Sequence, residues 1–222
     1  MVDRNEVLEE LKQVVTGKTI DAIIPPLLFV LVNNFSGLNP ALFTALGSAI
    51  VLGLIRLSKK QSWLYALGGL LGVALAAGLA YITQTATSYF VPALLSSALL
   101  FTVTLFSLFA GKPLAAWASH LTRGWPLAWF WRADVKPAYR EVTWLWAAML
   151  ATRLILQVYL FRQGAAFTLA WVNLLLGWPA IIIVLVFTYI YGIWRLRSLK
   201  GPGVEEFKLG KKPPWRGQTR GF

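Results

Sequence analysis

The chain has 222 residues, of which 57% are hydrophobic and only 14% are charged, and its net charge is +12. A soluble domain carries roughly 25% charged residues, so this composition excludes an ordinary soluble globular protein. The chain contains no cysteine, which excludes disulfides, thiolate metal sites and thiol nucleophiles.

The first segment, residues 1–19, mixes acidic and basic residues and lacks the apolar core of a cleaved signal peptide. Within residues 4–16, apolar side chains recur at helical spacing. This pattern predicts a short amphipathic helix. The helix would lie either at the membrane surface or in solvent ahead of the first span.

Long apolar segments then dominate the chain up to residue 194. A helix needs ~20 apolar residues to cross ~30 Å of hydrocarbon. The pattern therefore predicts an all-α fold, a polytopic transmembrane helical bundle of about six spans arranged as three hairpins. Spans 1–4 fall within residues 20–110 and spans 5–6 within residues 141–196. The apolar segments are 20–36, 39–56, 63–83, 89–110, 141–162 and 166–194.

The positions of the basic residues predict the orientation. Nineteen of the 21 Lys and Arg residues lie before span 1, between spans 2 and 3, between spans 4 and 5, or after span 6. Arg153 lies inside span 5, and Arg162 is the only basic residue in a connection on the opposite side. Membrane proteins concentrate Lys and Arg in cytoplasmic segments. We therefore expect both termini in the cytoplasm, and this rule explains the net charge without nucleic acid.

Two basic segments flank spans 5 and 6. Residues 111–140 form the only long internal connection, and residues 197–222 form a Gly-, Pro- and Lys-rich tail. Tryptophan prefers the headgroup layer, and basic side chains attract anionic lipids. We expect the connection to lie on the cytoplasmic leaflet, and the tail to be disordered unless a partner or lipid holds it. The predicted lipid-interface residues are Trp117, Trp125, Trp129, Trp131, Arg123 and Arg132.

Span 3 carries a stripe of small residues at four-residue spacing. Small side chains let membrane helices approach closely. We favour packing within the monomer over homodimerisation, although a homo-oligomer stays open. The stripe comprises Gly68, Gly72, Ala76 and Ala80.

Arg153 is the most informative single residue of the spans. It lies twelve residues after Glu141, about 18 Å along a helix. A charge at that depth costs at least ~2.5–3.5 kcal/mol and needs partners or water. Two interpretations remain open, a structural tie between helices and a site for an anion, a headgroup or a passing solute. The predicted intramembrane polar cluster consists of Arg153, Gln157, Asn33, Asn34 and Asn173.

The remaining polar residues do not form a recognisable catalytic pattern. His120 is the only histidine and has no acidic neighbour in sequence, and no phosphate-binding glycine loop or dinucleotide fingerprint occurs. Asn39-Pro40-Ala41 occurs once, so we interpret it as a turn and helix start rather than half of a water-channel pore. We predict no enzymatic activity, no metal site and no cofactor.

Several sequence strings together resemble one bacterial family. They are DAIIPPLLFVLVN in span 1, QSWLYALGGLLGVALAA in span 3, GKPL after span 4, RLILQV in span 5 and LLGWP in span 6. Their order is similar to an uncharacterised integral membrane family, domain of unknown function 3159, found mainly in actinobacteria and their relatives. The resemblance covers about residues 20–195 and implies a bacterial cytoplasmic (inner) membrane location.

The chain also resembles, more distantly, the intracellular septation protein A family, through an early proline-containing span and a KPL segment. That likeness implies a role in envelope synthesis or division through partner proteins. The extra span, the tryptophan-rich connection and the basic tail depart from the septation family. The resemblance carries over to Pro25, Pro26, Gly68, Gly69, Lys112, Pro113, Arg153, Gln157, Gly177, Trp178 and Pro179.

The sequence thus supports two functional hypotheses. The first is a non-enzymatic inner-membrane protein that supports envelope organisation through anionic lipids or through envelope or division proteins. The second is a transporter or channel for a small solute or anion, which would use the intramembrane polar cluster. A first span broken at Pro25-Pro26 would favour the second hypothesis, because unwound helices line many solute sites.

Overall fold

A computed structural model describes residues 18–60, 62–219 and 221–222, without the side chains of residues 18–22 and 65. The predicted amphipathic helix at residues 4–16 therefore lies outside the described part. All regular elements within the described ranges are helices, which agrees with the predicted all-α fold. The described residues form two compact units: unit 1 contains residues 99–152 and 180–222, and unit 2 contains residues 18–98 and 153–179.

In the described part of the chain, five helical segments are long and apolar enough to cross a membrane. A further apolar helix, Ile23–Ser36, is shorter. Large apolar side chains on these helices face outward, including Leu71, Phe106 and Ile183. Such extensive exposed apolar surface suits lipid rather than water. The five segments are Leu38–Ser58, Ala66–Thr83, Ala86–Phe109, Lys136–Arg162 and Ala166–Ser198.

Unit 2 begins with a tight helical hairpin. Helix α2 (Lys18–Ser36) continues through Pro25 and Pro26 without a break, which membrane helices tolerate when neighbouring groups satisfy the freed carbonyls. Gly37 alone separates it from α3 (Leu38–Ser58) and has a φ of 84°, a conformation that favours glycine. The Asn39-Pro40-Ala41 tripeptide lies in the first turn of α3, at a helix start as predicted.

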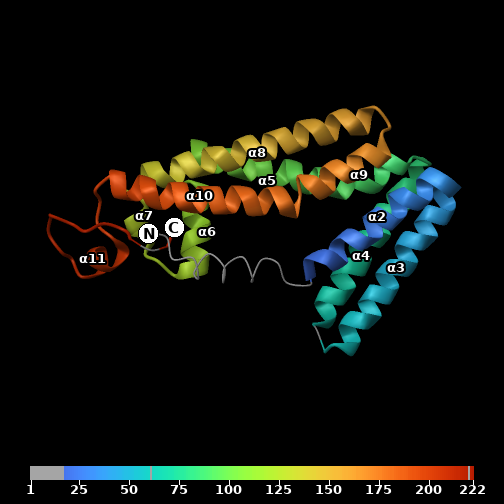
Figure 1. The fold of residues 1–222 in the computed structure, drawn as a ribbon, viewed down its shortest axis with the longest axis horizontal. Helices are drawn as coiled ribbons and strands as arrows, with labels where there is room; N and C mark the ends of the chain where they lie inside the picture. The colour runs from blue at the N-terminus through green and yellow to red at the C-terminus, as the bar shows by residue number, and fades with distance from the viewer. Residues whose placement is uncertain (1–17, 61, 220) are drawn as a thin grey trace. The chain divides into compact units, whose positions relative to one another are not determined.

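The core of unit 2 combines small residues with an aromatic cluster. Helix α3 contacts both α2 and α4 (Trp63–Thr83), while α9 (Ala166–Leu175) contacts α2 and the 3-10 helix η1 (Ala86–Phe90) (Figure 1). Phe29 stacks on Tyr89 with ring centroids 4.0 Å apart, and Phe90 meets both rings edge-on. Many neighbours of this aromatic cluster are alanines. Their small side chains let the surrounding helices approach one another closely.

The small-residue stripe of α4 divides into two halves. Ala76 and Ala80 are buried in the core of unit 2. Gly68 and Gly72 are exposed, and a Cβ added at either position would meet no atom within 4 Å. Only the second half of the stripe therefore packs against other helices of this unit.

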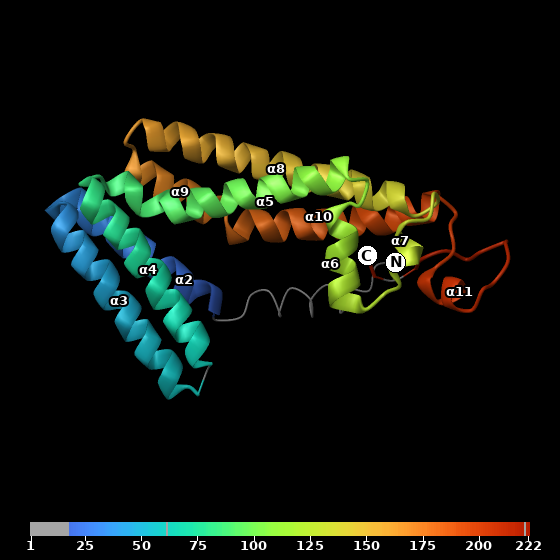
Figure 2. The same ribbon diagram turned by 180° about the vertical axis from the view of Figure 1, so that it is seen from behind.

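Unit 1 combines long helices with short interfacial ones. It contains the later part of α5 (Val91–Phe109), α6 (Leu114–Arg123), α7 (Leu127–Phe130), the first part of α8 (Lys136–Arg162), most of α10 (Trp178–Ser198) and α11 (Val204–Lys208). In both ribbon views the unit 1 parts of α5, α8 and α10 run alongside one another, and α6 lies across them (Figures 1 and 2). The predicted connection at 111–140 is thus largely helical.

An aromatic core holds unit 1 together. Trp129, Phe130 and Tyr139 are fully buried and meet edge to face. The indole Nε1 of Trp129 donates a hydrogen bond to the carbonyl of Pro202 at 2.9 Å. The prediction that Trp129 faces lipid is therefore wrong, because its ring and its N–H are both enclosed by protein. Trp117, Trp125 and Trp131 are partly exposed.

The tail beyond residue 197 differs from the expected disorder. Residues 201–204 are buried, and the Glu206 carboxylate accepts hydrogen bonds from the backbone N–H groups of Gly203, Arg216 and Gly217. These three donors lower the pKa of Glu206 below its ordinary value. The tail is ordered because its backbone forms hydrogen bonds with Trp129 and Glu206. The composition of the tail does not reveal these bonds.

We predict that Trp129→Ala lowers the free energy of unfolding by about 3–5 kcal/mol, because it removes a fully buried ring and its hydrogen bond. Thermal unfolding in detergent measures the effect. Trp194→Ala is the control, since that ring is 60% exposed. Equal losses in the two variants would contradict the interior role of Trp129.

The Glu206 contacts predict a pH-dependent tail. A carboxyl with a lowered pKa stabilises the fold above its unfolded pKa of about 4.3, and this contribution disappears as the pH falls through the lower folded value. Hydrogen exchange at the Gly203, Arg216 and Gly217 amides, corrected for intrinsic rates, should stay slow from neutral pH to about 5 and accelerate below about 4. Glu206→Gln should accelerate it at pH 7, whereas Glu205→Gln should not.

Candidate functional site

The structure brings two members of the predicted polar cluster together in unit 2. Gln157 on α8 is fully buried, and its Nε2 donates a hydrogen bond to Oδ1 of Asn173 on α9 at 2.5 Å. The other amide atoms, Gln157 Oε1 and Asn173 Nδ2, are buried and have no hydrogen-bond partner among the described residues. The pair therefore ties two helices together and retains one acceptor and one donor for a further polar group.

The other cluster members are less closely connected. Arg153 lies one turn before Gln157 on α8, and its buried Nε makes no hydrogen bond within the part of the chain that the structure describes. Asn33 is partly buried and Asn34 is exposed, and no hydrogen bond of the described residues joins either side chain to Gln157 or Asn173. The functional role of the cluster as a whole stays a prediction.

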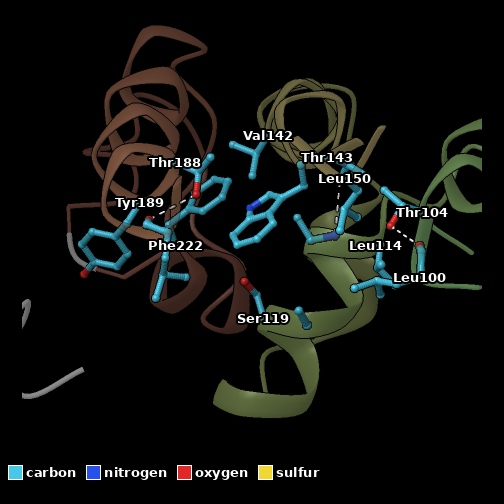
Figure 3. Close-up of a pocket in the computed structure, with 14 residues that line it drawn as sticks. Leu100, Thr104, Leu114, Ser119, Val142, Thr143, Leu150, Thr188, Tyr189 and Phe222 are labelled. Carbon is cyan, nitrogen blue, oxygen red and sulfur yellow. Dashed lines mark hydrogen bonds between the residues drawn. The ribbon is translucent and has the colours of Figure 1, made fainter. Parts of the chain in front are cut away.

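Unit 1 contains a cavity that the sequence did not indicate. Its volume is about 220 Å³, larger than the ~150 Å³ apolar cavity that holds benzene in another protein. The later part of α5 and helices α6, α8 and α10 form its walls (Figure 3). The aliphatic and aromatic lining includes Leu100, Leu114, Val142, Trp146, Leu150 and Leu185.

The cavity also has three threonines in its walls, but their hydroxyl protons are used elsewhere. Thr104, Thr143 and Thr188 each donate to a backbone carbonyl one turn earlier in their own helix, at 2.7 Å. Thr143 Oγ1 also accepts the N–H of Ala115 at 3.2 Å, which fixes α6 against α8. Ser119 and Tyr189 add two further hydroxyls to a lining that is otherwise mainly apolar. Such a lining suits a hydrocarbon group better than a polar solute.

Phe222 closes one side of the cavity. Its ring stacks on Tyr139 with centroids 4.3 Å apart, and its carbonyl oxygen accepts a hydrogen bond from Arg123 Nε at 3.3 Å. An added Cβ at Gly192 would lie 2.3 Å from the Phe222 ring, so this glycine admits the ring. The Arg123 guanidinium also lies 6.0 Å from the ring centroid of Tyr189, another lining residue. A basic group therefore stands beside an apolar cavity.

His120 has a structural role in this region. Its Nδ1 lies 2.6 Å from the carbonyl oxygen of Trp125, and because a carbonyl only accepts, Nδ1 carries the proton. The bond closes the turn after α6. Within the described residues, no group of three or more His, Cys, Asp or Glu side chains could hold a metal ion.

A family model described as "Protein of unknown function (DUF3159)" matches residues 16–197. The chain belongs to this family. No curated protein and no solved structure matches the chain. The DUF3159 region includes every cavity-lining residue except Phe222. It also includes the Gln157–Asn173 pair.

Sequence reasoning on this DUF3159 chain missed the cavity residues. Val142, Trp146 and Leu150 recur every four residues and share one face of α8, so their spacing indicates a buried face. It does not show that the face borders a void, because the gap arises from four helices and Phe222 together. The three lining threonines have no sequence feature that distinguishes them from other helix residues.

The Gln157–Asn173 bond predicts an energetic coupling. In a double-mutant cycle of Gln157→Leu and Asn173→Leu, thermal unfolding should give a coupling of about 0.6 kcal/mol and at most about 1.7 kcal/mol, the range for hydrogen bonds between membrane helices. Pairing Gln157→Leu with Asn34→Leu provides the control, since Asn34 is exposed and unconnected. A coupling of zero in the first cycle would show that the bond does not form.

Proposed function

We propose that this protein is a non-enzymatic bacterial inner-membrane protein that binds membrane lipid and thereby supports the envelope. In this proposal the unit 1 cavity holds an acyl chain, while basic side chains around it hold anionic headgroups. Envelope or division proteins would be further partners on the same surface. Both termini would lie in the cytoplasm, as the distribution of Lys and Arg favours.

The apolar wall of the unit 1 cavity is the observation that carries this proposal. Thr104, Thr143 and Thr188 donate their hydroxyl protons to their own helices. A polar solute would therefore gain no donor from these three side chains, and the mainly apolar wall would not replace the water that it loses. A methylene chain has no hydrogen bonds to water that it could lose on entering the cavity, and it gains close contacts with the wall. Lipid is also the apolar ligand that surrounds such helices at the highest concentration.

The charge balance of unit 1 supports an anionic headgroup. Residues 99–152 and 180–219 contain twelve Lys and Arg but four Asp and Glu. Asp134, Glu141 and Glu205 are paired with Arg132, Arg195 and Lys208, respectively. The surplus is therefore positive, and each basic residue near an anionic membrane surface contributes about 1 kcal/mol to attraction. The exposed basic residues include Lys112, Arg140, Arg197, Lys200, Lys211 and Lys212.

The second candidate function is transport of a small solute or anion, which would use polar residues of unit 2. Three buried atoms that have no hydrogen-bond partner in the described ranges could bind a polar molecule: Arg153 Nε, Gln157 Oε1 and Asn173 Nδ2. However, α2 is unbroken at Pro25 and Pro26, so the feature that would favour a solute pathway at that position is missing. Anion flux into liposomes, lost in Gln157→Leu, would favour transport over lipid binding.

A variant whose unit 1 cavity is filled by a larger side chain tests lipid binding. Ala118 lines the cavity and is exposed, so Ala118→Phe can fill the space without disturbing the core. We expect photoactivatable phosphatidylglycerol to label peptides of α5, α6, α8 and α10 in the wild type and to label this variant several-fold less. Ala128→Phe on α7 is the matched control, because Ala128 is exposed outside the cavity. Equal labelling of all three proteins would refute the proposal.

A further inference from the structure

The tail of unit 1 forms a pocket of a different kind from the apolar cavity, and it shares no lining residue with that cavity. Its volume is about 340 Å³, within the range of pockets that hold small ligands. Three cations line it, and no acidic side chain of the described residues does. We call it the basic pocket, and its cations are Arg197, Lys200 and Arg216.

The three cationic side chains of the basic pocket are available to a ligand. Those of Lys200 and Arg216 make no hydrogen bond, ion pair or ring contact in the part of the chain that the structure describes. The guanidinium of Arg197 makes one hydrogen bond there, from Nη2 to the carbonyl oxygen of Thr219 at 3.0 Å. Because a guanidinium has five N–H donors, most donors of Arg197 are unused. All three side chains are exposed.

Negative groups close to the pocket hold its two sides in place. The carboxylate of Glu206 accepts the backbone N–H groups of Arg216 and Gly217 at 2.8 and 3.1 Å. On the other side, Arg197 and Lys200 lie at the C-terminal end of α10, where the helix dipole favours positive charge. These contacts use the backbone amides and leave the three cationic side chains as the groups that can bind a ligand.

The backbone of Lys200 is unusual for a lysine. Its φ is 54°, a left-handed conformation that residues other than glycine adopt uncommonly. It lies just after the last turn of α10, where glycine most often takes this conformation. A glycine would therefore suit the backbone better. The group that the lysine adds at this position is the ammonium that lines the pocket.

The remaining wall of the basic pocket is apolar and has a fixed shape. Trp215 donates its Nε1 proton to the carbonyl of Lys211 at 2.9 Å, and the guanidinium of Arg132 lies 5.3 Å from its ring centroid. The neighbouring Pro213 and Pro214 each have a restricted φ. This wall can contact the carbon atoms that carry an anionic group, while the cations bind the group itself.

We propose that the basic pocket binds a phosphomonoester group. Such a group carries about 1.5 to 2 negative charges at pH 7 and has three strong acceptor oxygens, so each of the three cations can donate to an oxygen of its own. A phosphodiester or a carboxylate has a single negative charge and only two such oxygens. The number of free cations in the pocket therefore favours the monoester over either of these groups.

A lipid and a soluble molecule can both carry this group, since it is the headgroup of phosphatidic acid and also part of glycerol 3-phosphate. Where the group belongs to a lipid, the inference rests on the proposed function, because it then names a headgroup that the basic side chains of unit 1 hold. Where the group is soluble, the inference is independent of lipid binding in the cavity.

The test compares lipid retention by the full-length protein in a neutral detergent. Native mass spectrometry with phosphatidic acid, or with phosphatidylglycerol carrying the same acyl chains, should show a preference for phosphatidic acid. Lys200→Gly should weaken its retention about tenfold, the effect of losing one charge-assisted hydrogen bond, and glycine suits the backbone at this position. Arg216→Gln should have a similar effect, since it keeps the backbone N–H that bonds to Glu206.

Lys60→Gly is the matched control. Lys60 also has a positive φ, 55°, and it is exposed and lies outside the basic pocket. The variant removes the same charge and makes the same backbone change, so it should retain phosphatidic acid as the wild type does. Equal losses in Lys60→Gly and Lys200→Gly would overturn the proposal.

Glycerol 3-phosphate distinguishes the two sources of the group. If calorimetry shows that it binds to the wild type and about tenfold more weakly to Lys200→Gly, a soluble phosphomonoester is a ligand. Retention of phosphatidic acid without binding of glycerol 3-phosphate assigns the pocket to the lipid. Equal retention of the two lipids together with no binding of glycerol 3-phosphate would contradict the proposal.

Ala118→Phe separates this inference from the proposed function. Ala118 lines the unit 1 cavity and not the basic pocket, so the variant should keep the preference for phosphatidic acid. Equal photolabelling of the wild type and this variant, with that preference intact, would refute lipid binding in the cavity and leave the basic pocket standing.

Discussion

Hydrocarbon offers no hydrogen bonds, and this constraint organises the helices of this protein. Every buried donor or acceptor must find a partner within the protein or remain unsatisfied at a cost. Threonines such as Thr104 and Thr188 meet it by bonding to their own helix backbones, and the amides of Gln157 and Asn173 meet it by bonding to each other. The two prolines inside α2 remove two backbone N–H groups and free two carbonyls of the preceding turn, which neighbouring groups must satisfy.

The same constraint makes two hollows between the helices chemically different. In unit 1 the three lining threonines donate to their own helices, so the cavity between α5, α6, α8 and α10 is mainly apolar. In unit 2 the glycines of α4 border a groove, and Gly69 admits the guanidinium of Arg56 to it. The first hollow is therefore mainly apolar, while the second also has a basic side chain in its lining.

The tail lies almost entirely outside the region that the family model matches, yet it contributes to the structure of unit 1. The DUF3159 match ends at residue 197, yet Pro202 accepts the Trp129 hydrogen bond and Phe222 closes the unit 1 cavity. The walls of the cavity therefore belong to the matched region, and the side formed by Phe222 does not.

The sequence by itself determined the class of fold, because hydrophobic runs of about 20 residues and clustered basic residues reflect the thickness and the sidedness of a bilayer. It also identified Gln157 and Asn173 as polar residues that need partners, and Asn39-Pro40-Ala41 as a turn and helix start. Only the tertiary structure decided that Trp129 is interior, that Ala76 packs while Gly72 stays open, and that Arg56 lies in a groove. These outcomes depend on which helix faces which. Apolar residues surround a membrane helix on all sides, so the periodicity that marks the buried face of a soluble helix carries little information here.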